Sequence, residues 1–297
     1  MFFSVMAIFF IYAIIFILFE DYDRLYLQPF DETSDWHLLI FSIVVMAGLG
    51  WLLLRYSHRM DERIHQEQTE KQTVMRRELT QNISHELKTP VASILGYTET
   101  ILNNPDMSDE TKQQFIHRTH AQAVRLTSLL QDISTLNRMD YAADVLSFER
   151  TDVAAIVAEI IAETGPTLEE KRMTLHNYLP ESIVVQGNSS LLYSIFRNLI
   201  DNAIHYAGKG TVVELSAIKE SQQWRFTFAD NGQGIPSEHL PRIFERFYRI
   251  DKGRSRSMGG TGLGLAIVKN AVLLHGGNIS AQSSEGHGLS FSFTLKK

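Results

Sequence analysis

Residues 84–90 read Ser-His-Glu-Leu-Lys-Thr-Pro, and they lie in the middle of a helical pattern. Apolar side chains recur every three or four positions around this stretch, at Met75, Leu79, Ile83, Leu87, Val91 and Ile94. That spacing predicts an amphipathic helix that ends near Ile101. His85 falls away from the apolar stripe, and Pro90 predicts a kink because proline lacks an amide hydrogen. A proline shortly after an exposed histidine therefore indicates a functional site.

A second amphipathic helix follows on the C-terminal side. Residues 103–110 read Asn-Asn-Pro-Asp-Met-Ser-Asp-Glu, which is turn composition, and Ser108 is the predicted N-cap of the next helix. That helix is expected to reach about Met139, with an apolar stripe at Val124, Leu126, Leu130, Ile133 and Leu136. Two long amphipathic helices cannot bury both stripes alone, so they predict a four-helix bundle formed by a homodimer.

The C-terminal half of the chain mixes strand and helix patterns. Short strands are predicted near Val145–Arg150, Thr174–Leu179 and Ile183–Val185, and longer ones at Thr211–Lys219, Trp224–Ala229, Asn278–Ser283 and Leu289–Leu295. Helices are predicted at Val153–Glu163, Ser189–Tyr206 and Leu263–His275. Strands and helices that do not strictly alternate predict an α+β sandwich, with helices on one face of a mixed sheet.

Two polar clusters interrupt this apolar pattern. Asn198 and Asn202 lie four residues apart, on one face of an otherwise apolar helix. Buried amides need partners, so the pair predicts contact with a ligand or a metal; an amide pair that caps a neighbouring loop is the alternative. Asp230-Asn-Gly-Gln-Gly234 ends a predicted strand. Taken alone it is a weak signal, since Asp-Gly and Asn-Gly also form ordinary turns.

A third cluster is the glycine run Gly259-Gly-Thr-Gly-Leu-Gly264, which opens a predicted helix. Glycines at a helix N-terminus let backbone N–H groups approach an anion. Four basic residues precede the run and supply charge for phosphates: Arg249, Lys252, Arg254 and Arg256. A dinucleotide-binding turn does not fit, because a basic loop rather than a strand leads into the glycines. A Walker-A loop does not fit either, because no Lys-Ser or Lys-Thr closes the run.

In this order, the motifs resemble those of bacterial two-component sensor histidine kinases from about Gln72 to Lys297, with Phe244-Glu-Arg-Phe-Tyr-Arg249 as the F box. The resemblance implies that His85 accepts phosphate, that Glu86 takes its ring proton, and that Thr89 positions a water. The residue types suit these roles. A neutral imidazole nitrogen is a nucleophile near neutral pH, and an adjacent carboxylate can orient and deprotonate the opposite ring nitrogen. His205 departs from the common pattern, which often has Lys there. The resemblance assigns nucleotide binding to Asn198, Asn202, His205, Tyr206, Asp230, Gly232, Gly234, Arg249, Lys252, Arg254, Gly260, Thr261, Gly262, Leu263 and Gly264.

The implied activity is that of a protein-histidine kinase. With ATP and Mg²⁺, the latter held by Asn202, the chain is expected to phosphorylate His85 and then an Asp of a response regulator. Dephosphorylation of that regulator is expected as well. Two alternatives differ in their sequence features. A related ATPase of the gyrase and chaperone group would lack residues 84–90, and a catalytically silent scaffold would not need the glycine run.

The N-terminal part of the chain predicts a membrane anchor. Residues 1–19 and 38–54 carry no charge, and a helix needs about 20 apolar residues to cross a bilayer, with roughly 17–25 tolerated. A cleaved signal peptide is the alternative for the first run, but it lacks a basic start and a small-residue cleavage site. Arg55, Arg59 and Arg63 follow the second run, and an excess of basic residues marks the cytoplasmic side of a span. The kinase part is therefore expected in the cytoplasm, and the chain is expected to be a multi-pass protein of the bacterial inner membrane.

The expected organisation is therefore membrane spans at 1–19 and 38–54, an extracytoplasmic loop at 20–37, a helical linker at 55–75, a dimerisation and phosphotransfer domain at 76–140, and an ATP-binding domain at 145–297. The linker is too short for a sensory domain. The signal is expected to enter through the membrane helices, a partner membrane protein or the loop, whose six acids are also typical of a solvated turn.

Composition limits the alternatives further. The chain has 297 residues, no cysteine and a formal net charge of −6. Without cysteine there is neither a disulfide framework nor a thiolate metal site. The mild acidity argues against nucleic acid as a partner, because such proteins carry a basic patch. A mean hydropathy of −0.09 is an average over the apolar runs and a polar remainder.

Overall fold

A computed structural model of the chain describes residue 12 and residues 32–141, 146–250, 260–283 and 286–297. The chain divides into two compact units, Met1–Arg76 and Arg77–Lys297. The predicted span at 1–19 lies outside the described residues apart from Tyr12, and so does most of the predicted loop. In the described part, no helix combines the length and the hydropathy that a membrane crossing demands.

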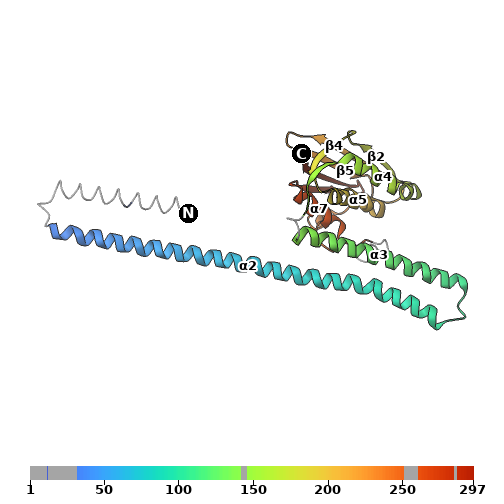
Figure 1. The fold of residues 1–297 in the computed structure, drawn as a ribbon, viewed down its shortest axis with the longest axis horizontal. Coiled ribbons are helices and arrows are strands. Elements are labelled where there is room, and N and C mark those ends of the chain that lie inside the picture. Colours follow the sequence, from blue (N-terminus) through green and yellow to red (C-terminus); the bar gives the residue numbers. More distant parts are fainter. Residues whose placement is uncertain (1–11, 13–31, 142–145, 251–259, 284–285) are drawn as a thin grey trace. The chain divides into compact units, whose positions relative to one another are not determined.

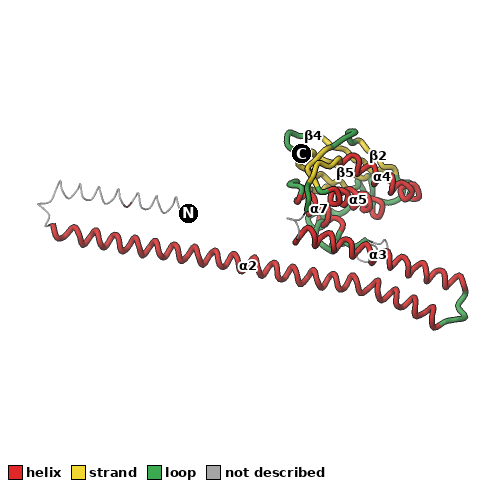
Figure 2. The backbone as a smooth tube through the Cα atoms, in the orientation of Figure 1, coloured by secondary structure: helices red, strands yellow, loops and turns green. Residues whose placement is uncertain are grey.

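The phosphotransfer region is a pair of long helices joined by a short turn (Figures 1 and 2). Helix α2 (Glu32–Asn103) is continuous through Pro90, and it begins at Glu32 rather than at Leu38. Helix α3 (Asp109–Tyr141) starts where the turn composition predicts. Ser108 is its N-cap, because the Ser108 hydroxyl accepts a hydrogen bond from the Thr111 amide at 3.3 Å. The predicted hairpin is confirmed.

The C-terminal half folds as a mixed sheet with helices on one face. The sheet order is β2 (Thr174–Tyr178), β4 (Val212–Lys219), β5 (Gln223–Asp230), β7 (Leu289–Lys296) and β6 (Ile279–Ser283). Only the β2–β4 pair is parallel. A second, two-stranded sheet pairs β1 (Glu149–Asp152) with β3 (Val184–Gly187). The predicted α+β architecture is confirmed.

The core lies between this sheet and the helices α4 (Val153–Glu170), α5 (Ser189–Tyr206) and α7 (Gly264–Leu274). Alternate residues of the strands point into it, and Phe226 of β5 stacks on Phe293 of β7 with ring centroids 5.1 Å apart. Phe196 of α5 meets both rings edge-on. Such aromatic pairs add about 0.5–1.5 kcal/mol each beyond burial. The α5 helix, which carries the two asparagines, is therefore fixed on the sheet.

Two predicted boundaries in this half are wrong. The first strand, predicted at Val145–Arg150, pairs at Glu149–Asp152 because its partner β3 sets the register, and residues 146–148 are not in a strand. Helix α4 extends beyond Glu163 to Glu170, through Gly165 and Pro166. The buried Thr164 hydroxyl donates to the Ile160 carbonyl at 2.7 Å, and buried Leu168 anchors the last turn, so tertiary packing overrides the local breakers.

Candidate functional site

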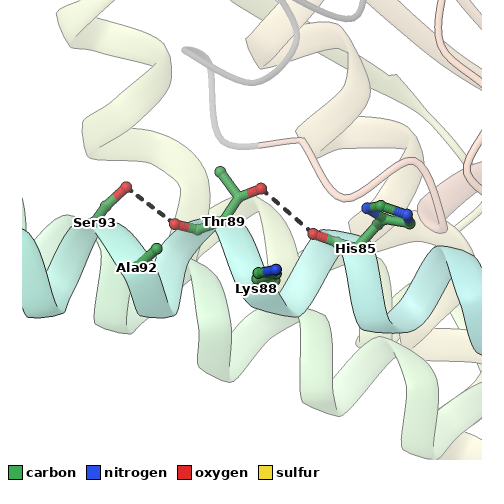
Figure 3. A pocket seen from close by; sticks show the side chains of 5 residues that line it. All are labelled: His85, Lys88, Thr89, Ala92 and Ser93. Carbon is green, nitrogen blue, oxygen red and sulfur yellow. Dashed lines mark hydrogen bonds between the residues drawn. The ribbon is translucent and has the colours of Figure 1, made fainter.

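The hairpin presents His85 on its solvent-exposed side, as the periodicity predicts. Figure 3 shows His85 and Thr89 on the same side of α2, together with Lys88, Ala92 and Ser93, which line one shallow pocket. The Thr89 hydroxyl donates to the His85 carbonyl at 3.3 Å, and the Ser93 hydroxyl donates to the Thr89 carbonyl at 3.0 Å. An exposed imidazole beside a hydroxyl one turn away is open to a reacting group from another domain or protein.

Glu86, the residue after this histidine, faces two arginines. Its carboxylate accepts hydrogen bonds from Arg125 of α3 at 3.4 Å and from Arg249 at 3.2 Å. The Arg249 side chain is only 6% exposed, and it also donates to the Gly260 carbonyl at 2.7 Å. Arg249 therefore connects the hairpin carboxylate directly to the glycine run.

Helix α5 positions the two asparagines. The Asn198 amide nitrogen donates to the Ser194 carbonyl at 2.8 Å, which orients its amide. Asn202 is half-buried, and the hydrogen bonds that side chains of α5 make to described residues do not include one from its amide. His205 places Nδ1 2.6 Å from the Asp201 carbonyl, so that nitrogen carries the proton and donates. Tyr206 is half-buried at the end of the helix.

Asp230 ends strand β5 beside α5. Its carboxylate accepts a hydrogen bond from the Gly232 amide at 2.9 Å, and burial raises its pKa above the ordinary value. Gly232 lies so close to α5 that a Cβ there would be 2.3 Å from the Ala207 carbonyl oxygen. Gly234 has a φ of +67°, in the left-handed region. Only glycines let this turn pass against the helix.

The glycine run meets the segment before it through the backbone. The Phe247 amide donates to the Gly262 carbonyl at 2.8 Å, although Phe247 has a positive φ of 61°. Leu263 is buried, and α7 starts directly after it at Gly264 with no side-chain cap. The uncapped N-terminus leaves backbone N–H groups available to an anion.

These residues fit a magnesium nucleotide. Asn202 offers an amide without a protein partner in the described residues, Asp230 offers a half-buried acceptor for an amino group, and α7 offers a helix N-terminus for phosphate. A side chain at position 264 would fill the space in front of Asn198, because its Cβ would be 2.5 Å from Asn198 Oδ1. Two predicted contacts, Lys252 and Arg254, lie outside the described residues.

Two carboxylates of α3 at the contact between hairpin and catalytic domain were missed by sequence reasoning. Asp132 of α3 accepts a hydrogen bond from the Thr261 hydroxyl at 2.7 Å. Asp140 pairs with Arg246 at 2.8 Å. The available signal was Asp132 itself, because a carboxylate three residues after Leu129 and four before Leu136 lies on the apolar face of the helix.

Two protein families match the chain. Residues 75–142 match the His Kinase A (phospho-acceptor) domain. Residues 187–297 match the histidine kinase-, DNA gyrase B- and HSP90-like ATPase family. The matched ranges contain His85 and the glycine run respectively.

Individual proteins agree with the families. The sensor-like histidine kinase SenX3 of Mycolicibacterium smegmatis is 35% identical over 220 residues, which are 74% of this chain and 57% of that protein. The chain thus spans about half the length of the curated relatives it matches. Histidine kinase AdeS of Acinetobacter baumannii shares the fold, with a TM-score of 0.59 and 24% identity. The match covers 71% of this chain and 97% of the AdeS chain. Histidine kinase ShkA, solved in complex with AMPPNP, matches with a TM-score of 0.54 and 26% identity. The match covers 71% of this chain and 44% of the ShkA chain.

Proposed function

Because the chain belongs to the bacterial two-component sensor histidine kinases, we propose that it transfers the γ-phosphoryl group of ATP to its own His85. The observation that carries this proposal is the path from Glu86 through Arg249 to Gly260, which joins the exposed histidine to the candidate nucleotide site within one compact unit. The similarity to ShkA, which was solved with AMPPNP, supports the choice of nucleotide.

In the proposed reaction a ring nitrogen of His85 attacks the γ-phosphorus, an N–P bond forms, and the bond to the bridging oxygen of ADP breaks. The proton on the other ring nitrogen passes to Glu86. Mg²⁺ held by Asn202 would neutralise charge on the phosphates. The chain itself supplies mainly position, through the backbone of the glycine run and the Asn198 and Asn202 amides. The direct test is incubation of the purified chain with γ-labelled ATP, which should give an acid-labile, base-stable phosphohistidine; label stable in acid would exclude it.

We also propose a homodimer. Several apolar side chains of the hairpin remain exposed in the single chain, namely Val91 (49%), Leu95 (56%), Leu102 (79%), Ile116 (44%), Val124 (56%) and Leu130 (51%). A second hairpin would cover them in a four-helix bundle. The partner proposed for the phosphorylated histidine is an Asp of a response regulator.

Dephosphorylation of that regulator is a second proposed activity, and it depends on Thr89. The Thr89 hydroxyl is exposed beside His85, where it can orient a water toward a docked phospho-aspartate. We expect Thr89→Ala to reduce regulator dephosphorylation by about tenfold or more, a typical loss for one positioned hydrogen bond. Autophosphorylation should change much less, since the proposed nucleophile His85 and the proposed base Glu86 are both retained.

The matched control is Ser93→Ala, which removes a hydroxyl from the same pocket one turn further along α2. It should leave both activities near the level of the unaltered chain. Both rates are measured on one preparation, with phosphorylated regulator and with labelled ATP. Equal losses of the two activities in Thr89→Ala would refute the assignment.

We further propose that residues 1–19 and 38–54 cross the bacterial inner membrane. In support, apolar side chains between Ile43 and Leu54 are exposed at consecutive positions of α2, so the apolar surface continues around the helix. A helix that is apolar on every side belongs in an apolar environment. A partner membrane protein or the loop between the spans is the proposed signal input.

The absence of cysteine makes the topology testable. A single cysteine at Asp23 should react with a membrane-impermeant maleimide in intact cells, because the loop would lie outside. One at Ser57 should react only after lysis, because the basic flank stays in the cytoplasm. Labelling of both sites before lysis, or of Ser57 alone, would overturn the proposed orientation.

A further inference from the structure

At the contact between the hairpin and the catalytic domain, Asp132 of α3 forms no ion pair with any cation of the described residues. Asp132 lies between Leu129 and Leu136, which are 3% exposed and belong to the same buried cluster as α7. In the described residues its one hydrogen-bond partner is the Thr261 hydroxyl at 2.7 Å, and it has no ion pair. The other two carboxylates at this contact, Glu86 and Asp140, are each paired with arginine.

A half-buried carboxylate with no ion pair among the described residues favours its neutral form. Burial raises the pKa of Asp132 from 3.8 to about 6, in opposition to the Thr261 hydrogen bond, and the Asp201 charge on α5 raises it further. Asp201 is paired with Arg197 at 2.9 Å. Among the described residues, the other cations of the contact are Arg125, Arg246 and Arg249, and each is directed to another carboxylate. Lys252, Arg254 and Arg256 lie outside the described residues. Separation of the domains would return Asp132 to water.

We propose that Asp132 is a positioning residue, which docks the glycine run of the catalytic domain on the hairpin through Thr261 and takes up a proton when the two dock. Docking therefore orients the residues next to Gly260 toward the hairpin helix that carries the phosphoacceptor. The contact does not require phosphoryl transfer, so it can be tested independently of the proposed kinase activity.

The sign of the pH dependence follows from proton uptake. The docked state binds a proton that the undocked state releases, so docking is favoured at low pH and is weakened as the pH rises through about 6. With an undocked carboxyl at its ordinary value, the docking constant should fall about tenfold between about pH 5 and about pH 8.

Because the chain has no cysteine, a fluorophore pair can be placed uniquely at Lys112 of α3 and Ser221 between β4 and β5. The full chain in lipid nanodiscs, diluted with unlabelled chain, would report docked and undocked populations by energy transfer at each pH. We expect the docking constant of the otherwise unaltered chain to fall about tenfold over this range. Asp132→Asn stays neutral and still accepts the Thr261 hydrogen bond. We expect this variant to remain docked at both ends of the pH range, with its docking constant changing by less than about twofold.

The matched control is Asp140→Asn, which removes a carboxylate from the same helix and should retain the tenfold response. Thr261→Val should weaken docking at low pH, because it removes the donor. Circular dichroism verifies that each variant is folded. The proposal is overturned if Asp132→Asn keeps the pH response, if it is undocked at both pH values, or if the unaltered chain shows no response.

Discussion

The His85→Ala chain is expected to incorporate no phosphate from ATP while it binds ATP as tightly as the unaltered chain. His85 is exposed on α2, so its loss should cost little stability. It is the nucleophile of the proposed reaction, so without it no phosphohistidine can form. We expect the rate to fall at least about a thousandfold.

Two measurements separate this result from misfolding. Calorimetric titration with a non-hydrolysable ATP analogue should give an unchanged dissociation constant. His120→Ala, which removes an exposed histidine from the other hairpin helix, should still be phosphorylated. Labelled phosphate on the His85→Ala chain would mean that another residue accepts the phosphoryl group, and the proposed function would be lost with it.

The features that could be predicted from the sequence are those set by local spacing. The apolar stripe around His85 predicted the part of α2 that forms the first helix of the hairpin, and Ser108 predicted the start of α3. The α5 helix begins and ends where predicted, at Ser189 and Tyr206, because its buried face repeats with a helical period along its whole length.

The features that failed depend on partners distant in sequence. Nothing local to Gly165 and Pro166 shows that Leu168 will be buried, so α4 appeared to end early. The first strand was misplaced because β3 decides its register. Asp132 and its bond to Thr261 join residues 129 positions apart, and no spacing rule reaches that far. The motifs of the candidate site could be recognised from the sequence. The contact that joins the glycine run of the catalytic domain to the hairpin could not.

Replacing Gly264 by alanine is expected to weaken ATP binding by about tenfold or more, which corresponds to at least about 1.4 kcal/mol. Gly264 is the first residue of α7, and its new Cβ would lie 2.5 Å from Asn198 Oδ1, closer than any normal contact. Asn198 cannot turn away freely, because its amide nitrogen is held by the Ser194 carbonyl. Either the asparagine or the helix N-terminus must move, and both belong to the candidate phosphate site.

The same substitution at Gly165 provides the matched control. Gly165 lies inside α4 of the same domain, and a Cβ there would meet no atom within 4 Å apart from its chain neighbours and the backbone of its own helix. Gly165→Ala should leave ATP affinity unchanged, because position 165 is not part of the candidate nucleotide site. A Gly264→Ala chain that binds the ATP analogue as tightly as this control would show that Asn198 and the start of α7 do not form the nucleotide site.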